Sequence, residues 1–164
     1  MKGIEKALRE DKLFIGKTQG DSMYPMLISG RDSVVIEPPV FPLKKYDVPV
    51  YRRDDHYTMH RIVKVTRKGY IICGDNRTHL ERDITDNDIV GVLTAFYHDG
   101  KFVKCTDEAY IRYSRKVCRS LPVRIAKNLI RRILKKSDQD NSQQRNQQVS
   151  AQTHRRIQPF RTAY

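Results

Sequence analysis

The segment Gly20-Asp21-Ser22-Met23-Tyr24-Pro25-Met26-Leu27 is the part of the sequence around which the rest is best understood. Gly20 can adopt backbone conformations that other residues avoid, so the chain can turn tightly as it reaches Ser22. Pro25 has no amide hydrogen and a fixed φ, which disfavours an uninterrupted helix through the segment. We therefore expect Ser22 at the start of a loop or of a short helical turn. Taken alone, such a serine is more often a turn or cap residue than a nucleophile.

Two later segments change this interpretation. They are Tyr57-Thr58-Met59-His60-Arg61-Ile62-Val63-Lys64-Val65 and Ile71-Ile72-Cys73-Gly74-Asp75-Asn76-Arg77. With the serine segment, and in this order, they resemble three boxes of the signal peptidase I and LexA-like serine peptidase clan. The resemblance covers about residues 13 to 104. It implies a mainly β fold, the coiled antiparallel sheet or partly open barrel of that clan.

The resemblance also implies roles for particular residues. Ser22 corresponds to the nucleophile, within a box that includes Asp21, Met23 and Pro25. His60 stands where many members carry a lysine base, as in the archaeal and endoplasmic-reticulum type. The chemistry agrees, because a serine hydroxyl needs an adjacent base and an imidazole can accept its proton near neutral pH.

Two aspartates are candidates for orienting His60. Asp75 matches the Gly-Asp-Asn-Arg box and is expected across a hairpin from His60. Asp83 follows eight residues later, near the spacing at which histidine-type relatives carry a second aspartate. We favour Asp75 over Asp83, with a turn residue that caps its own backbone as the alternative role for Asp75.

One position departs from the clan. Signal peptidases commonly supply a hydroxyl to the oxyanion from the residue two before the nucleophile, and that residue here is Gly20. The backbone amide of Ser22 is the natural donor. Asp21, a further amide or another group has to replace the missing hydroxyl.

Charge divides the chain into parts. Residues 1–110 contain 18 Lys or Arg against 17 Asp or Glu, whereas residues 111–164 contain 14 against 2. We expect a signal-peptidase-like catalytic domain over 1–106, a basic helical extension over 107–136 and a disordered polar tail over 137–164.

Alternating and β-branched runs predict the secondary structure of the domain. The expected strands are residues 13–15, 33–36, 47–51, 57–66, 70–73, 89–97 and 102–104, after a short helix over 2–11. Pro49 favours an edge or bulge position for its strand. Residues 121–136 predict a basic amphipathic helix with Pro122 in its first turn, which either packs on the catalytic domain or binds an anionic membrane surface.

Other residue types indicate where the protein acts and what it lacks. No apolar run is long enough to span a bilayer, and residues 1–11 lack the apolar core of a secretory signal. The sequence has three cysteines, an odd number without metal-site spacing, which fits a reducing compartment. Together these features favour a cytoplasmic protein, which would be peripheral at the membrane if the basic helix binds lipid. We expect no cofactor and no metal, because His56, His60 and His79 lack ligand-pair spacing. His56, His79 and Lys64 are weaker alternatives to His60 as the base.

We weigh three functions. The first is a serine endopeptidase that cleaves a peptide or protein precursor through a Ser22–His60 dyad oriented by an aspartate, with small residues before the cleaved bond as the resemblance implies. The second is a non-catalytic peptide-binding module on the same fold. The third, a LexA-like self-cleaving regulator, is less favoured because 21 residues before Ser22 leave no room for a helix-turn-helix, and nucleic acid is not an expected partner.

Overall fold

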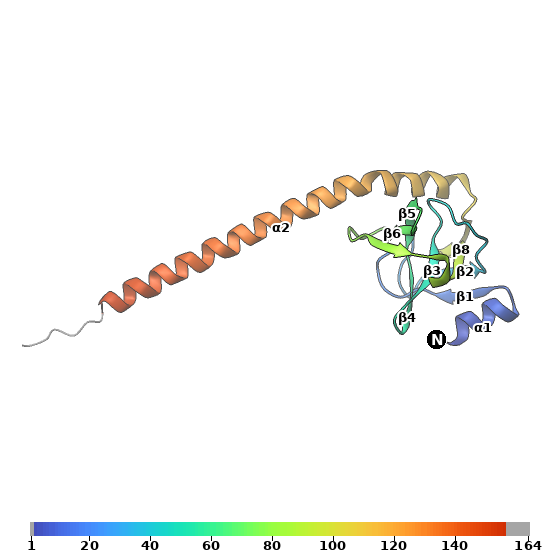
Figure 1. Ribbon diagram of the computed structural model, residues 1–164, viewed down its shortest axis with the longest axis horizontal. Coiled ribbons are helices and arrows are strands. Elements are labelled where there is room, and N and C mark those ends of the chain that lie inside the picture. Colours follow the sequence, from blue (N-terminus) through green and yellow to red (C-terminus); the bar gives the residue numbers. More distant parts are fainter. Residues whose placement is uncertain (1, 157–164) are drawn as a thin grey trace, which may run out of the picture. The chain divides into compact units, whose positions relative to one another are not determined.

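Two antiparallel sheets form the body of the protein, which we describe from a computed structural model covering residues 2–156, with side chains described for 3–136 (Figure 1). The larger sheet runs in the order β1-β2-β8-β3-β4, and β9 pairs with β8 beside this path. Its strands are β1 (Phe14–Lys17), β2 (Ser33–Glu37), β3 (Pro49–Arg53), β4 (His56–Met59), β8 (Ile89–His98) and β9 (Lys101–Lys104). The predicted mainly β fold is confirmed, and the sheets do not close into a barrel.

The smaller sheet consists of β5 (Arg61–Thr66), β6 (Gly69–Cys73) and β7 (Glu81–Ile84) in that order. Sequence patterning predicts one strand over 57–66, but the structure divides it at His60. Residues before His60 pair with β3 in the larger sheet, while residues after it pair with β6 in the smaller one. His60 therefore lies where the chain passes from one sheet to the other.

Strand β7 is not expected from the sequence, because Glu81-Arg82-Asp83-Ile84 is polar and short. It forms by pairing with β6, where Glu81 lies opposite Ile72 and Ile84 opposite Tyr70. Cross-strand pairing supplied by a neighbour here overrides weak local β propensity. The 3-10 turn Asp86–Asp88 then leads into β8.

Pro49 begins β3, which is an interior strand between β8 and β4. The expectation of an edge or bulge position holds for the bulge, since the β3–β8 register shifts between Val50 and Tyr51. Pro49 pairs with Val92 as the first residue of the strand, a position at which proline is tolerated although it lacks an amide donor.

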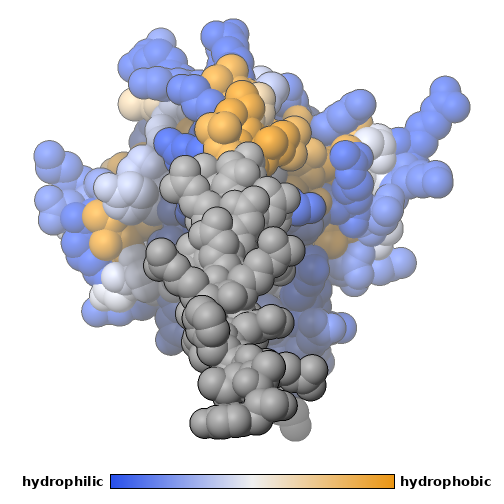
Figure 2. All heavy atoms as spheres, turned by 90° about the vertical axis from the view of Figure 1, so that its left-hand side faces the viewer, coloured by the Kyte–Doolittle hydropathy of each residue, from blue (hydrophilic) through white to orange (hydrophobic). Residues whose placement is uncertain are grey.

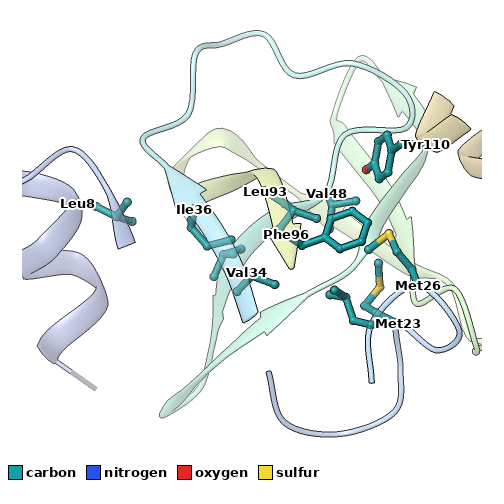
Figure 3. Packing of buried hydrophobic residues seen from close by; sticks show 11 residues of the cluster. Leu8, Met23, Met26, Val34, Ile36, Val48, Leu93, Phe96 and Tyr110 are labelled. Atoms are coloured by element: carbon teal, nitrogen blue, oxygen red, sulfur yellow. The ribbon is translucent and has the colours of Figure 1, made fainter. Parts of the chain in front are cut away.

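The main core is formed by buried side chains of the larger sheet, and the segment that follows β1 packs against it. Figure 3 shows Val34, Ile36, Leu93 and Phe96 pointing from β2 and β8 into this core, with Met23 contributed by the loop. A second, smaller cluster under β5 and β6 includes Tyr51, Ile62 and Ile72, none of which is exposed. Burial of an aliphatic side chain of this size contributes about 1.5–3 kcal/mol.

Two helices flank the strands in sequence. Helix α1 (Lys2–Glu10) agrees with the prediction and buries Leu8 against the core. Helix α2 (Glu108–Arg156) begins near the start of the predicted extension at 107, thirteen residues before the amphipathic helix predicted from 121, and continues past 136. Its early start follows from tertiary contacts, because Tyr110 and Ser114, one turn apart, are buried on the body. Pro122 lies within the helix, where it removes one backbone hydrogen bond.

The chain divides into two compact units, the first ending at Pro122 and the second beginning at Val123. The first turns of α2 thus belong to the unit that contains both sheets. The predicted tail over 137–164 is helical in its backbone as far as Arg156, and 157–164 lie outside the described residues. Over the part of the chain described here, no helix has both the length and the apolar character needed to cross a membrane.

Candidate functional site

Ser22 lies in a hydrogen-bonded turn between β1 and β2, as the sequence predicts. The amide of Tyr24 donates to the Asp21 carbonyl at 3.1 Å, and that of Leu27 donates to the Met23 carbonyl at 3.0 Å. Met23 and Leu27 are buried, so the part of the loop that follows the half-buried serine is anchored in the core. We call residues 20–27 the serine loop.

The loop over 74–77 packs directly against the serine loop. The amide of Asn76 donates to the Ser22 carbonyl at 2.8 Å. The carboxylate of Asp21 forms an ion pair with Arg77 and accepts a longer bond from the Asn76 side chain. The hydrogen bond from Arg77 lowers the pKa of Asp21 below its ordinary value. Asp21 is therefore an ionised carboxylate that links the two loops through its ion pair.

Gly74 brings the serine loop and His60 together. A β-carbon at Gly74 would stand 2.7 Å from the Ser22 carbonyl oxygen and 3.1 Å from Cδ2 of His60. Cδ2 neighbours Nε2 and lies across the ring from Nδ1. The Cδ2 flank of the imidazole thus faces the point at which Gly74 contacts Ser22, and only glycine leaves room for this approach.

The opposite side of the imidazole is held by Glu81. Nδ1 of His60 is 2.7 Å from Oε1 of Glu81, and the hydroxyl of Tyr51 donates to the same oxygen at 2.8 Å. Arg53 forms an ion pair with Oε2 of Glu81. A carboxylate can only accept at Nδ1, which places the proton on Nδ1 and leaves Nε2 as the basic nitrogen.

The environment keeps this imidazole neutral. Burial lowers the pKa of His60 below its ordinary value, although the hydrogen bond and charge of Glu81 act in the opposite direction. The side chain of His60 is 12% exposed and that of Glu81 is 10% exposed. His60 is therefore unprotonated at neutral pH, the state that a general base requires.

The carboxylate of Asp75 lies elsewhere, and the prediction that it orients His60 is wrong. Asp75 binds the guanidinium of Arg61 through two bonds, Nε to Oδ1 at 2.8 Å and Nη2 to Oδ2 at 2.7 Å. Arg61 is completely buried and also donates to Tyr110 and Ser114 of α2. Although burial acts against it, the pKa of Arg61 is raised because Asp75 stabilises its charge.

The physical reason is charge pairing. A buried guanidinium requires a carboxylate, and Asp75 is the carboxylate that meets it with two parallel hydrogen bonds. Asp75 thus joins β5, the loop over 74–77 and the start of α2, where Tyr113 donates a further bond to it at 3.1 Å.

Asp83 does not orient His60 either, because it is exposed in β7 with a φ of 62°. Glu81, two residues earlier, has that position. Glu81 and Tyr51 are not among the candidates predicted from the sequence, since neither belongs to a box of the resembling clan. Predicting a third strand beside the β5–β6 hairpin would have pointed to Glu81, because Glu81 is the first residue of that strand and lies near His60.

Of the remaining candidates, His56 and Met23 line the same cavity as Ser22. His56, His79 and Lys64 are exposed. Pro25 is exposed on the serine loop, whereas Met23 is buried in the core below it. Within residues 3–136, no group of three His, Cys, Asp or Glu side chains is arranged to hold a metal ion.

Ser22 lines a cavity of about 810 Å³, within the size range of pockets that hold small ligands. Strands β1 and β4, at the two ends of the larger sheet, both contribute residues to it. Gly20 also lines the cavity, with a φ of 81°.

The segment that follows the serine loop is held in place by Asp32. Asp32 is buried and accepts bonds from the amide of Ile28 at 2.9 Å and from the guanidinium of Arg31. Nδ1 of His98, at the end of β8, lies 2.9 Å from the same carboxylate. The chain before β2 is therefore held to the sheet at Asp32, which fixes the exit of the loop.

Comparison with known proteins gives one match. A family model described as peptidase S24-like matches residues 3–94, which contain the serine loop, His60, the loop over 74–77 and Glu81. A search of curated proteins found no match.

Proposed function

The chain belongs to the peptidase S24-like family, and on this basis we propose that it is a serine endopeptidase with Ser22 as nucleophile, His60 as general base and Glu81 as the group that orients His60. Membership of the family supports a serine peptidase or a LexA-like protein. The observation that carries the finer proposal is the contact of Glu81 with Nδ1 of His60 at 2.7 Å, together with the approach of the opposite ring flank to the serine loop.

The reaction follows from these positions. The hydroxyl oxygen of Ser22 attacks the carbonyl carbon of the peptide bond while its proton passes to Nε2 of His60. The carboxylate of Glu81 keeps Nδ1 protonated and stabilises the imidazolium. The backbone amide of Ser22 donates to the oxyanion, in the absence of a side-chain hydroxyl at Gly20.

The intermediate then collapses. The bond between carbon and the leaving nitrogen breaks, and Nε2 of His60 gives its proton to that nitrogen. A water molecule attacks the resulting ester of Ser22 with His60 again as base, which releases the acid and restores the serine hydroxyl.

Cleavage of an unbiased peptide pool, with products identified by mass spectrometry, tests this proposal. We expect products with the wild-type protein and none with Ser22→Ala or His60→Ala. His56→Ala is the matched control, because His56 is an exposed histidine four residues from His60; it should retain most of kcat, whatever change its place in the cavity wall makes to KM.

Equal loss in His56→Ala and His60→Ala would refute the assignment of the base. Peptides that bind without any product dependent on Ser22 would instead favour a non-catalytic binding module.

A further inference from the structure

The cavity beside Ser22 has a polar rim and an apolar floor. The exposed residues Lys17, Gln19 and Asp21 line it on the solvent side. The interior is lined by aliphatic, aromatic and methionine side chains, among them Ile4, Phe14, Met23, Val34, Val50 and Met59. Met23, Val34 and Val50 are at most 6% exposed, so the floor of the cavity reaches the core of the protein.

The strands that border the cavity suit an extended chain. β1 and β4 are the last strands at either end of the larger sheet, so each presents an edge to which a further strand can add. A peptide that pairs with such an edge directs alternate side chains to one side. The cavity borders both of these strands and has its apolar interior next to Ser22.

We propose that this cavity binds an extended peptide with large apolar side chains beside the cleaved bond, a specificity unlike the small residues that the sequence resemblance implies. The inference rests on the proposed function. A cavity of about 810 Å³ would stay largely empty around a methyl group. Leucine or phenylalanine removes more apolar surface from water there, and we expect at least about a tenfold gain in affinity over alanine.

Methionine methyl resonances offer a direct test, because two methionines line the cavity and a third does not. Met23 and Met59 line it, whereas Met26 is buried with its sulfur 3.0 Å from Nη2 of Arg61. The full chain with Ser22→Ala, labelled with ¹³C in its methionine methyl groups, would be titrated with peptide pairs that differ only in Ala-Ala or Leu-Leu at the centre.

We expect both kinds of peptide to shift the Met23 and Met59 signals, with a dissociation constant at least about tenfold lower for the Leu-Leu peptides than for the Ala-Ala peptides. The change at Met26 should be smaller. Equal affinities, or no shift at Met23 and Met59 with any peptide, would overturn the inference. The Ser22→Ala protein cannot react through Ser22, so this result is independent of whether wild-type protein cleaves peptides.

Two matched variants locate the binding. Ile4→Ser places a hydroxyl in the cavity wall on α1, and we expect it to weaken Leu-Leu binding severalfold. Val65→Ser makes the same kind of change at an aliphatic residue of β5 that is 45% exposed and does not line the cavity, and it should leave binding unchanged. The same loss in both variants would contradict the cavity as the site.

A separate observation concerns α2 beyond Pro122, taken by itself. Five aliphatic side chains there are between 56% and 59% exposed, namely Val123, Leu129, Ile130, Ile133 and Leu134. Six cations accompany them without any acidic residue between 121 and 136, namely Arg124, Lys127, Arg131, Arg132, Lys135 and Lys136. At 3.6 residues per turn, Val123, Ile130 and Leu134 share one side while Arg124, Arg131 and Lys135 share another.

We propose that this segment, residues 123–136, binds the surface of an anionic membrane. The aliphatic side would lie among the acyl chains, while the cations bind lipid phosphates. Charge argues against a second copy as the occupant, because two such helices side by side would bring twelve cations together. Figure 2 shows apolar side chains gathered in patches on a mainly hydrophilic surface.

Sedimentation of the full chain with vesicles tests this second proposal. We expect binding to phosphatidylcholine mixed with phosphatidylserine, little binding to phosphatidylcholine alone, and release by added salt. Lys127→Gln should lower the partition coefficient about fivefold, the share of one cation near such a surface.

The apolar side has its own variant and control. Ile130→Ser should weaken vesicle binding, whereas Val65→Ser, at an aliphatic residue of β5 that is 45% exposed, should not. Equal binding to neutral vesicles, or no binding to anionic ones, would overturn the proposal, as would self-association of the protein that Ile130→Ser abolishes.

Discussion

Replacing Glu81 by glutamine separates the roles of the carboxylates around the site. The substitution keeps the shape of the side chain and removes its charge. Arg53 donates to Oε2 of Glu81, so in Glu81→Gln the amide oxygen is favoured at that position. The amide nitrogen then faces Nδ1 of His60 and the hydroxyl of Tyr51, where the carboxylate oxygen lies 2.7 and 2.8 Å from them.

An amide nitrogen can only donate, so it would stabilise the tautomer with Nδ1 bare and Nε2 protonated. That tautomer cannot accept the proton of Ser22. We expect kcat to fall by about 10²- to 10⁴-fold, the range for loss of the orienting carboxylate in serine peptidases, with a small change in KM.

The assay is the rate of cleavage of the best peptide found in the pool, together with ¹⁵N spectra of histidine. The spectra should show the proton on Nδ1 of His60 in wild type and on Nε2 in Glu81→Gln. Asp83→Asn is the matched control, since it makes the same carboxylate-to-amide change at an exposed residue of the same strand. It should keep activity within about twofold.

Two results would refute the reasoning. One is a folded Glu81→Gln protein with nearly full activity. The other is a large loss of activity in Asp75→Asn without loss of stability, which would return the orienting role to Asp75.

Three further predictions follow from the same contacts. The value of kcat/KM should fall with acid at a midpoint below the ordinary pKa of histidine, about 6.5, because a protonated His60 is inactive and burial lowers its pKa; a midpoint above that ordinary value would contradict this. Asp75→Ala should lower the free energy of unfolding by about 3–5 kcal/mol, measured by urea denaturation, since it leaves the charge of Arg61 buried and unpaired; a loss below about 1 kcal/mol would show that the pair is unimportant. Gly74→Ala should reduce the rate of cleavage by about 10- to 100-fold, because its β-carbon would stand 2.7 Å from the carbonyl oxygen of Ser22 and displace the serine loop.

The parts of the fold that local patterning determines were predictable. Alternating residues place β2, β6 and β8 close to their observed positions, and the turn chemistry of Gly20 and Pro25 predicts the loop around Ser22. The resemblance adds the order of three boxes, and the family match supports it.

What patterning missed depends on contacts between distant parts of the chain. The division of the predicted strand at His60 depends on which sheet each half pairs with, and the alternating pattern over 57–66 carries no sign of it. Helix α2 starts early because Tyr110 and Ser114 bind Arg61, a contact across about fifty residues. Local propensity does not contain such information.

The error over Asp75 has the same origin. A carboxylate one strand away from His60 is a reasonable partner until a buried arginine competes for it. Arg61 follows His60 directly in the sequence, but only its complete burial makes a carboxylate partner obligatory. Glu81 is then left for His60.

Covalent trapping of Ser22 tests its role as nucleophile and that of His60 as base, and it requires no knowledge of the substrate. The protein would be treated with a fluorophosphonate and the adduct followed by mass spectrometry of the intact chain. We expect one adduct, on Ser22, that forms much more slowly in His60→Ala and in Glu81→Gln and not at all in Ser22→Ala. An adduct that forms at the same rate with or without His60, or no adduct on Ser22 of the wild-type protein, would contradict these roles.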